Sequence, residues 1–297
     1  MKRKREVKIQ KGALNMWDGI QLSGFADEID MDLEKQIQVL KKLNISYVEM
    51  RGVNGKGLVE RSIDEVKEIK RRLEACGIRL SSVGSPIGKI QITDDFEPHM
   101  ELYKHTVEIA HELETPYIRM FSFFMPQNES YLPYRDKVME RLGRFADYAK
   151  SNDVVLLHEN EKEIYGDVAD RCLDIMKEFY GEHFKAVFDF ANFVQCRQNT
   201  LEAYEMLKPY IAYIHIKDAR WSDAGVVPSG MGDGNVEKIL KLLKDSGYKG
   251  FLSLEPHLSD FDGFSALEQN AGEKRKLNGE EAFTMAYDAL QKILGKI

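Results

Sequence analysis

The fold is decided by four short runs in the second half of the chain: VVLLHEN (154–160), AVFDFAN (186–192), YIHIKD (213–218) and GFLSLEPH (250–257). Their apolar residues follow one another almost without interruption, which is typical of strands that are covered on both faces. The intervening segments are long enough to hold a helix, and parallel strands need such crossovers. This half of the chain is therefore predicted to be a series of parallel strands joined by helices.

Four similar runs precede these: IQLSGFAD (20–27), YVEM (47–50), RLSSVGS (79–85) and YIRMFSF (117–123). Eight strands with helical crossovers predict either a closed (β/α)8 TIM barrel or an open doubly wound sheet. An open dinucleotide-binding sheet would carry a GxGxxG turn after its first strand, and none is present. We therefore expect an α/β fold with a single-domain TIM barrel.

Two of the predicted helices have clear ends. In residues 59–77, Ser62 and Glu65 have the spacing of a capping box and Gly77 marks the stop, while residues 235–247 end at Gly247. The apolar stripes are Ile63, Val66, Ile69 and Leu73 in the first helix and Val236, Ile239, Leu240 and Leu243 in the second. Such one-sided stripes predict helices that pack against the sheet.

Composition narrows the class of partner. The 297 residues are 43% hydrophobic and carry a formal net charge of −7, which argues against a general nucleic-acid-binding surface, because phosphate neutralisation needs Lys and Arg. The cysteines Cys76, Cys172 and Cys196 show no paired spacing, so neither a disulfide framework nor a thiolate zinc site is expected. No apolar run is long enough to span a membrane. A cytoplasmic protein is expected.

Two segments are predicted to lie outside the regular barrel. Residues 1–19 are basic and lack a continuous apolar region, so we expect a surface extension and assign the barrel to residues 20–297. Residues 259–279 are rich in Ser, Asp, Gly and Asn and are predicted to form a long loop before a terminal helix at 280–294.

The ends of the last four predicted strands carry the strongest functional signal. They hold Glu159, Asp189, His215 and Glu255. Neighbouring strands lie about 4.8 Å apart, so these side chains can converge at the mouth of a barrel. Crowded carboxylates repel one another unless a cation lies between them. Taken singly, each residue could instead cap a helix or be a structural histidine, but four in succession favour one divalent metal: Mn²⁺ first, with Mg²⁺, Co²⁺ or Zn²⁺ as alternatives.

The motifs LHEN, FDFAN, IHIKDAR, PSGMGDGNV and GFLSLEP resemble, in this order, those of the xylose-isomerase-like family of sugar isomerases and epimerases. The resemblance is strongest over 154–257 and weaker over 24–124, where VEMRG and SSVGSPIGKI are similar. It implies that Glu159, Asp189, His215 and Glu255 are metal ligands. It also implies that Glu159 and Glu255 move protons through an enediolate of a small sugar or polyol, and related barrels often pair as homo-oligomers.

One position departs from the family pattern. Many members have His three residues after the aspartate of the sixth strand, whereas this chain has Asn192, which can hydrogen-bond a hydroxyl but cannot shuttle a proton. Related apurinic-site endonucleases use several additional histidines, but His99, His105 and His111 fall in a predicted helix here. A nuclease is therefore disfavoured.

Further polar residues near the strand ends are candidates for substrate binding. They are Glu49, Lys89, Asn192, Lys217, Asp218, Arg220 and His257. Lys217 could give a hydrogen bond or a proton, and Lys89 or Arg220 could meet a phosphate or carboxylate. Salt bridges along the rim are the alternative for each of them.

These patterns predict a metal-dependent isomerase or epimerase of a sugar, sugar phosphate or polyol. A dehydratase of a keto-inositol-like compound on the same scaffold is the second reading, because both reactions begin with an enediolate. A barrel that binds its ligand through the metal without catalysis is the third.

Overall fold

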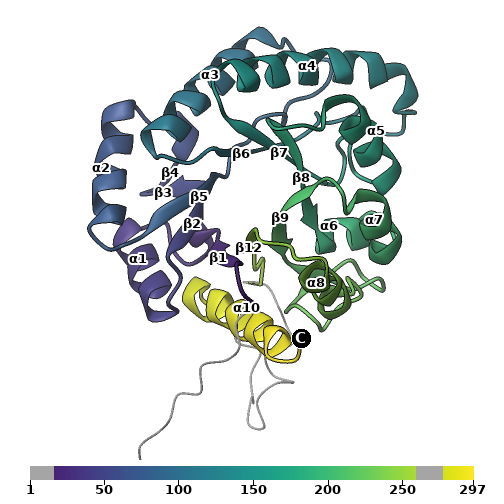
Figure 1. Ribbon diagram of the computed structural model, residues 1–297. Coiled ribbons are helices and arrows are strands. Elements are labelled where there is room, and N and C mark those ends of the chain that lie inside the picture. The colour runs from purple at the N-terminus through teal and green to yellow at the C-terminus, as the bar shows by residue number, and fades with distance from the viewer. Residues whose placement is uncertain (1–16, 259–276) are drawn as a thin grey trace, which may run out of the picture.

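The computed structural model describes residues 17–258 and 277–297, and all structural statements concern these residues. Eight parallel strands form one sheet, which curves into a barrel with helices on its outside (Figure 1). The barrel strands are β1 (Gln21–Gly24), β2 (Tyr47–Met50), β5 (Arg79–Val83), β6 (Tyr117–Met120), β7 (Val155–Glu159), β8 (Phe184–Asp189), β9 (Ile211–Ile216) and β12 (Phe251–Leu254). The predicted single-domain TIM barrel is confirmed.

The barrel closes between its first two strands. Around the sheet the order is β2, β5, β6, β7, β8, β9, β12 and β1. Phe25, directly after β1, forms a parallel bridge with Glu49 of β2 and so joins the two ends of the sheet. Closure matters for function, because side chains at the carboxyl ends of all eight strands then border one common mouth.

Helices surround the sheet. They are α1 (Leu33–Lys42), α2 (Ile63–Glu74), α3 (Glu97–Glu112), α4 (Arg135–Ser151), α5 (Ala169–Phe179), α6 (Phe190–Gln195), α7 (Thr200–Leu207), α8 (Val236–Asp245) and α10 (Gly279–Leu294). The predicted capping box at Ser62 and Glu65 begins α2. All four predicted apolar residues of α8 are buried. His99, His105 and His111 lie on α3, as predicted, away from the strand ends.

Aromatic rings fill the amino-terminal part of the barrel. The ring of Tyr213 on β9 lies 5.4 Å from Phe251 and 6.3 Å from Tyr117. Its hydroxyl is 2.8 Å from Ser81 Oγ. Because alternate residues of a strand face the same side, His215 points into the same interior as Tyr213, but closer to the mouth.

The terminal helix α10 packs against the first strand. A Cβ on Gly24 would lie 2.6 Å from Phe283 Cζ, so a side chain at this position would push the helix away from the barrel. The predicted loop at 259–279 falls almost entirely outside the described residues, and the predicted extension at 1–19 mostly does. Trp17 is buried, with its ring 6.0 Å from that of Tyr248.

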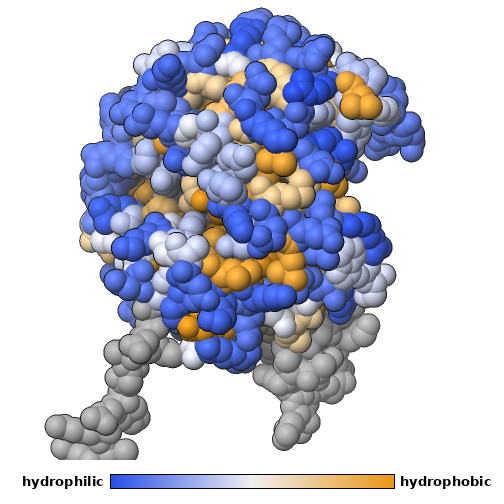
Figure 2. Space-filling view, turned by 45° about the vertical axis from the view of Figure 1, so that its right-hand side comes forward, coloured by the Kyte–Doolittle hydropathy of each residue, from blue (hydrophilic) through white to orange (hydrophobic). Residues whose placement is uncertain are grey.

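Polar residues dominate the face of the molecule that Figure 2 shows. Most of the face in Figure 2 is hydrophilic, and hydrophobic side chains show there in limited patches. The large hydrophobic residues exposed in the described part are Met31, Leu132, Tyr180, Met231 and Leu242. The three cysteines form no disulfide. None of the described helices combines the length and apolar character needed to cross a membrane.

Candidate metal centre

Four potential ligands from neighbouring strands meet in the mouth of the barrel. Glu159 and Asp189 end β7 and β8, His215 is the penultimate residue of β9, and Glu255 directly follows β12. One ligand atom of each lies within 4.8 Å of the others, and all four residues are buried. The structure thus brings together the residues that the sequence singled out, and the cluster could hold a divalent ion.

Asp189 shows how the local fold directs one oxygen at the cluster. It is the N-cap of α6, and its Oδ1 accepts a hydrogen bond of 2.8 Å from the backbone N–H of Asn192. Its Oδ2 has no hydrogen bond, although Lys217 Nζ lies 3.0 Å away as an ion-pair partner. The ammonium group of Lys217 still stabilises the negative charge on Oδ2, because attraction between opposite charges does not require hydrogen-bond geometry. A buried carboxylate oxygen with no hydrogen bond suits coordination of a cation.

The charged groups in this pocket shift one another's pKa values. Burial, together with the nearby carboxylates of Glu255 and Glu159, raises the pKa of Asp189 to about 7, although Lys217 opposes this rise. Burial would also raise the pKa of Glu159, but His215 and Arg119 more than offset it and hold the pKa at about 2. Three carboxylates and one imidazole form an oxygen-rich donor set, so the residues present fit a divalent ion of the Mn²⁺ or Mg²⁺ type.

His215 is held at both ring nitrogens. Its Nδ1 lies 3.0 Å from Glu159 Oε1 and faces the other carboxylates of the cluster, whereas its Nε2 lies 3.2 Å from Glu49 Oε2. Edge-on rings of Phe25 and Tyr213 pack beside the imidazole, at 5.2 and 5.7 Å between centroids. The sequence had suggested substrate binding for Glu49, and the structure places its carboxylate against His215.

Arg119 was not among the residues singled out from the sequence. It lies on β6, only 4% exposed, and its Nη1 is 3.1 Å from Glu159 Oε2. Its Nη2 points to the carbonyl oxygens of Gly84 and Ser85. The available signal was a charged residue inside the otherwise apolar run YIRMF, because a buried strand tolerates an arginine only with a partner.

Two further cations contact Glu255. Lys217 donates a hydrogen bond of 2.8 Å to Glu255 Oε2 and is itself buried, so this candidate does lie at the cluster. Arg51 Nη1 lies 3.3 Å from Glu255 Oε1, and the same guanidinium pairs with Asp27 and Glu28. Glu255 is therefore held from two sides.

Three more candidates lie beside the cluster or at its rim. Asn192 is buried and donates to Glu159 Oε1 at 3.3 Å. Lys89 pairs with Glu161 at 3.3 Å. His257 is 43% exposed, and its Nε2 lies 3.5 Å from Glu255 Oε1.

Asp218 and Arg220 are engaged elsewhere. Asp218 accepts backbone hydrogen bonds from Gly230, Gly232 and Gly234, at 2.9 to 3.0 Å, and so fastens the glycine-rich loop. Arg220 is exposed and pairs with Asp223 at 2.6 Å. Their predicted contacts with substrate stay predictions.

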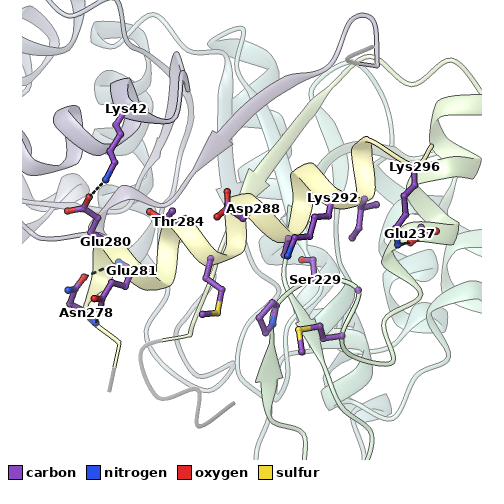
Figure 3. Close-up of a pocket in the computed structure, with 16 residues that line it drawn as sticks. Lys42, Ser229, Glu237, Asn278, Glu280, Glu281, Thr284, Asp288, Lys292 and Lys296 are labelled. Atoms are coloured by element: carbon purple, nitrogen blue, oxygen red, sulfur yellow. Dashed lines mark hydrogen bonds and ion pairs between the residues drawn. The ribbon is translucent and has the colours of Figure 1, made fainter. Parts of the chain in front are cut away.

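A large groove lies apart from these ligands. It has a volume of about 700 Å³ and runs along α10, where Lys42 and Glu280 mark one end and Glu237 and Lys296 the other (Figure 3). None of its lining residues belongs to the metal cluster. The volume of a groove therefore does not locate the chemistry, and the buried ligands mark the candidate site better than this groove does.

Comparisons with known proteins agree with this architecture. The sequence profile described as "Xylose isomerase-like TIM barrel" matches residues 37–281. A 3-dehydroshikimate dehydratase from Bacillus anthracis is 20% identical over 183 residues. The alignment covers 56% of this chain and 65% of that protein, slightly less than two thirds of its length.

Solved structures share the fold. The IolI protein, solved with a bound zinc atom, superimposes with a TM-score of 0.71 at 17% identity, and the match covers 93% of this chain and 98% of that one. A D-tagatose 3-epimerase-like protein gives a TM-score of 0.69 at 17% identity, with 93% and 99% covered. Identity this low shows a common fold and no more.

Proposed function

Because the chain belongs to the xylose isomerase-like TIM barrel family, we propose that it is a divalent-metal-dependent isomerase or epimerase of a sugar, sugar phosphate or related polyol. The observation that carries this proposal is the buried convergence of Glu159, Asp189, His215 and Glu255 in the mouth of the barrel. Carboxylates are expensive to bury, so a cluster of three with an imidazole favours a role in binding a cation.

In this proposal the four clustered residues hold the ion, with Mn²⁺ as first choice and Mg²⁺, Co²⁺ or Zn²⁺ as alternatives. The bound ion would polarise a substrate carbonyl and so make the neighbouring C–H more acidic. A protein of the same fold that was solved with a zinc atom supports a metal in barrels of this kind.

Glu159 and Glu255 are proposed as the acid and base. They come from β7 and from the end of β12, so they can approach a substrate carbon from different directions. Arg119 and Lys217 hold them ionised and oriented through contacts of 3.1 and 2.8 Å. An ionised, fixed carboxylate can accept a proton from the substrate carbon without first reorganising its surroundings, and once protonated it can act as the acid that returns the proton to the enediolate.

Asn192 occupies the position where many relatives have a histidine. It donates to Glu159 Oε1 at 3.3 Å and to the Asn160 carbonyl at 2.9 Å. An amide in this place can orient Glu159 but cannot carry a proton. Proton transfer is therefore assigned to the two glutamates and not to this position.

A dehydratase is the second candidate, since a curated relative carries that name. Proton abstraction next to a carbonyl begins both reactions, and loss of a β-hydroxyl distinguishes the second. Incubation with Mn²⁺ and a panel of ketoses, keto-inositols and 3-dehydroshikimate separates them, because isomerisation conserves the mass of the substrate and dehydration removes one water.

A binding protein without catalysis is the third candidate. It would bind a ligand in the presence of Mn²⁺ and convert no member of the panel with any of the four metals. Turnover that disappears on chelation and returns with Mn²⁺ would instead support the enzyme. We further propose that the protein acts in the cytoplasm. We also propose that it forms a homo-oligomer, which light scattering of the chain in solution would test.

A further inference from the structure

We propose that Glu49 is a positioning residue of the metal centre. It holds the remaining N–H of His215 at Nε2, so that Nδ1 is the nitrogen that binds the ion. This inference rests on the metal site of the proposed function. It assigns Glu49 a role behind a ligand in place of contact with the substrate.

The geometry places Glu49 between two neighbours across the barrel. It is fully buried on β2, and its Oε2 accepts hydrogen bonds from His215 Nε2 at 3.2 Å and from Ser253 Oγ at 2.7 Å. Ser253 on β12 is the parallel partner of His215 on β9. A carboxylate from β2 thus reaches the imidazole from the side opposite the cluster, and a serine from a third strand holds it there.

The contact between Glu49 and His215 Nε2 affects which ring nitrogen can bind an ion. A neutral imidazole has one N–H and one lone pair, and a carboxylate can only accept a hydrogen bond. Carboxylates face both ring nitrogens, Glu159 at Nδ1 and Glu49 at Nε2, so without an ion each nitrogen can donate. When an ion takes the place of the Nδ1 proton, the one N–H left on the neutral ring is at Nε2, where Glu49 accepts it. Nδ1 is the nitrogen that lies 3.0 Å from Glu159 and 3.7 Å from Glu255.

Packing opposes a rotation of the His215 ring that would exchange Nδ1 and Nε2. The imidazole is fully buried beside the edges of Phe25 and Tyr213, so exchange of the two nitrogens by rotation would disturb both aromatic rings. A carboxylate behind a ligating histidine also makes the imidazole a stronger donor, and loss of such a partner typically weakens metal binding by about 10- to 100-fold.

A simple space-filling role explains Glu49 less well. Its second oxygen, Oε1, is buried without a hydrogen bond. Burying an incompletely paired carboxylate costs stability, so an apolar side chain of similar size would serve packing better. The two readings therefore differ in what they predict for Glu49→Leu.

The test compares Glu49→Leu and Glu49→Gln with the unmodified 297-residue chain, using Mn²⁺ alone as the probe in isothermal titration calorimetry. Affinity should fall about 10- to 100-fold in Glu49→Leu and less in Glu49→Gln, because glutamine can still accept from Nε2. Glu161→Gln removes a carboxylate that pairs with Lys89 and Lys162, and should stay within about threefold. Unchanged affinity in a folded Glu49→Leu variant would overturn the proposal.

A second measurement needs no Glu49 variant to fold. Long-range ¹H–¹⁵N spectra of the unmodified protein, labelled at histidine and loaded with Zn²⁺, should show His215 protonated at Nε2 and bound to zinc through Nδ1. Zinc on Nε2 would overturn the proposal. If the ion binds as expected but no sugar is converted, the proposed function fails and this inference stands. Turnover together with unchanged affinity in Glu49→Leu would instead uphold the function and overturn the inference.

Discussion

Arg119 Nη1 lies 3.1 Å from Glu159 Oε2, and neither side chain is more than 5% exposed. The guanidinium also lies over the ring of Phe25, 4.9 Å from its centroid. The pair connects β6 to a metal-ligand candidate on β7. Any change that breaks it should therefore alter both the stability of the barrel and the binding of the ion.

Replacing Arg119 with Met should destabilise the protein, because it leaves the buried Glu159 without its guanidinium partner. Breaking a buried pair from one side typically costs about 3–5 kcal/mol. Urea unfolding in the presence of a chelator measures this cost, and Mn²⁺ should reduce it by supplying positive charge. In Arg144→Met, which breaks an exposed pair with Glu97, the loss should be about 1 kcal/mol or less. Equal losses in the two variants would contradict the assignment.

Glu159→Gln should abolish tight binding of Mn²⁺ while the barrel stays folded. Loss of a carboxylate that binds the ion directly should lower the affinity by more than the roughly 10- to 100-fold seen when a residue behind a ligand is lost. Calorimetry measures the affinity, and far-UV circular dichroism checks the fold. Glu161→Gln, the same substitution two residues along, is the control. An unaltered affinity would remove Glu159 from the ligand set.

Glu255→Gln tests the acid–base role. Turnover measured at saturating Mn²⁺ should fall by about 10²- to 10⁴-fold, the usual contribution of a general acid or base. Because Glu255 is also a proposed ligand, its substitution should weaken binding of the ion as well, so calorimetry sets the Mn²⁺ concentration that fills the variant's site. A loss of turnover at that concentration is then a loss of proton transfer. Retained turnover with metal bound would move the role to another residue.

Asp218→Ala tests whether this residue supports the loop or touches substrate. It removes the acceptor for the amides of Gly230, Gly232 and Gly234, so unfolding should become easier by about 3 kcal/mol. If Asp218 acts only on the loop, Asp218→Asn should recover part of the stability and of the KM together. A large rise in KM without loss of stability would indicate direct contact with substrate.

His99 should make stability depend on pH. Its Nε2 accepts a hydrogen bond of 2.7 Å from Gly88, and burial lowers its pKa to about 4. Between about pH 6.5 and pH 4, His99 is protonated in the unfolded chain, where its pKa is near 6.5, but stays neutral in the folded chain. The stability is therefore complete above about pH 6.5 and decreases as the pH falls toward 4, by about 2 kcal/mol after allowance for partial exposure.

Urea unfolding at pH 7.5 and pH 4.5 measures this decrease. His99→Gln should show a smaller decrease than the unmodified protein, because glutamine can accept from Gly88 but does not titrate. The same decrease in both proteins would show that other groups cause it.

The ends of the strands could be predicted because they depend on local pattern. Near-continuous apolar runs separated by capped helices indicate parallel strands, and such strands all point their carboxyl ends in one direction. Glu159 and Asp189 occupy strand ends in the sequence itself, so their meeting followed from the barrel. Asn192, three residues beyond Asp189, could be placed near the site for the same reason.

The sequence by itself determined the barrel and the set of four converging residues, since both follow from strand order and strand direction. Only the tertiary structure decided which buried charges neutralise one another. Arg119 and Glu49 lie within apolar strands, and their partners are 40 and 166 residues away in the chain. A strand that is buried on both faces has no alternating pattern to show which of its residues point inward, so contacts across the barrel become visible only when the sheet has closed.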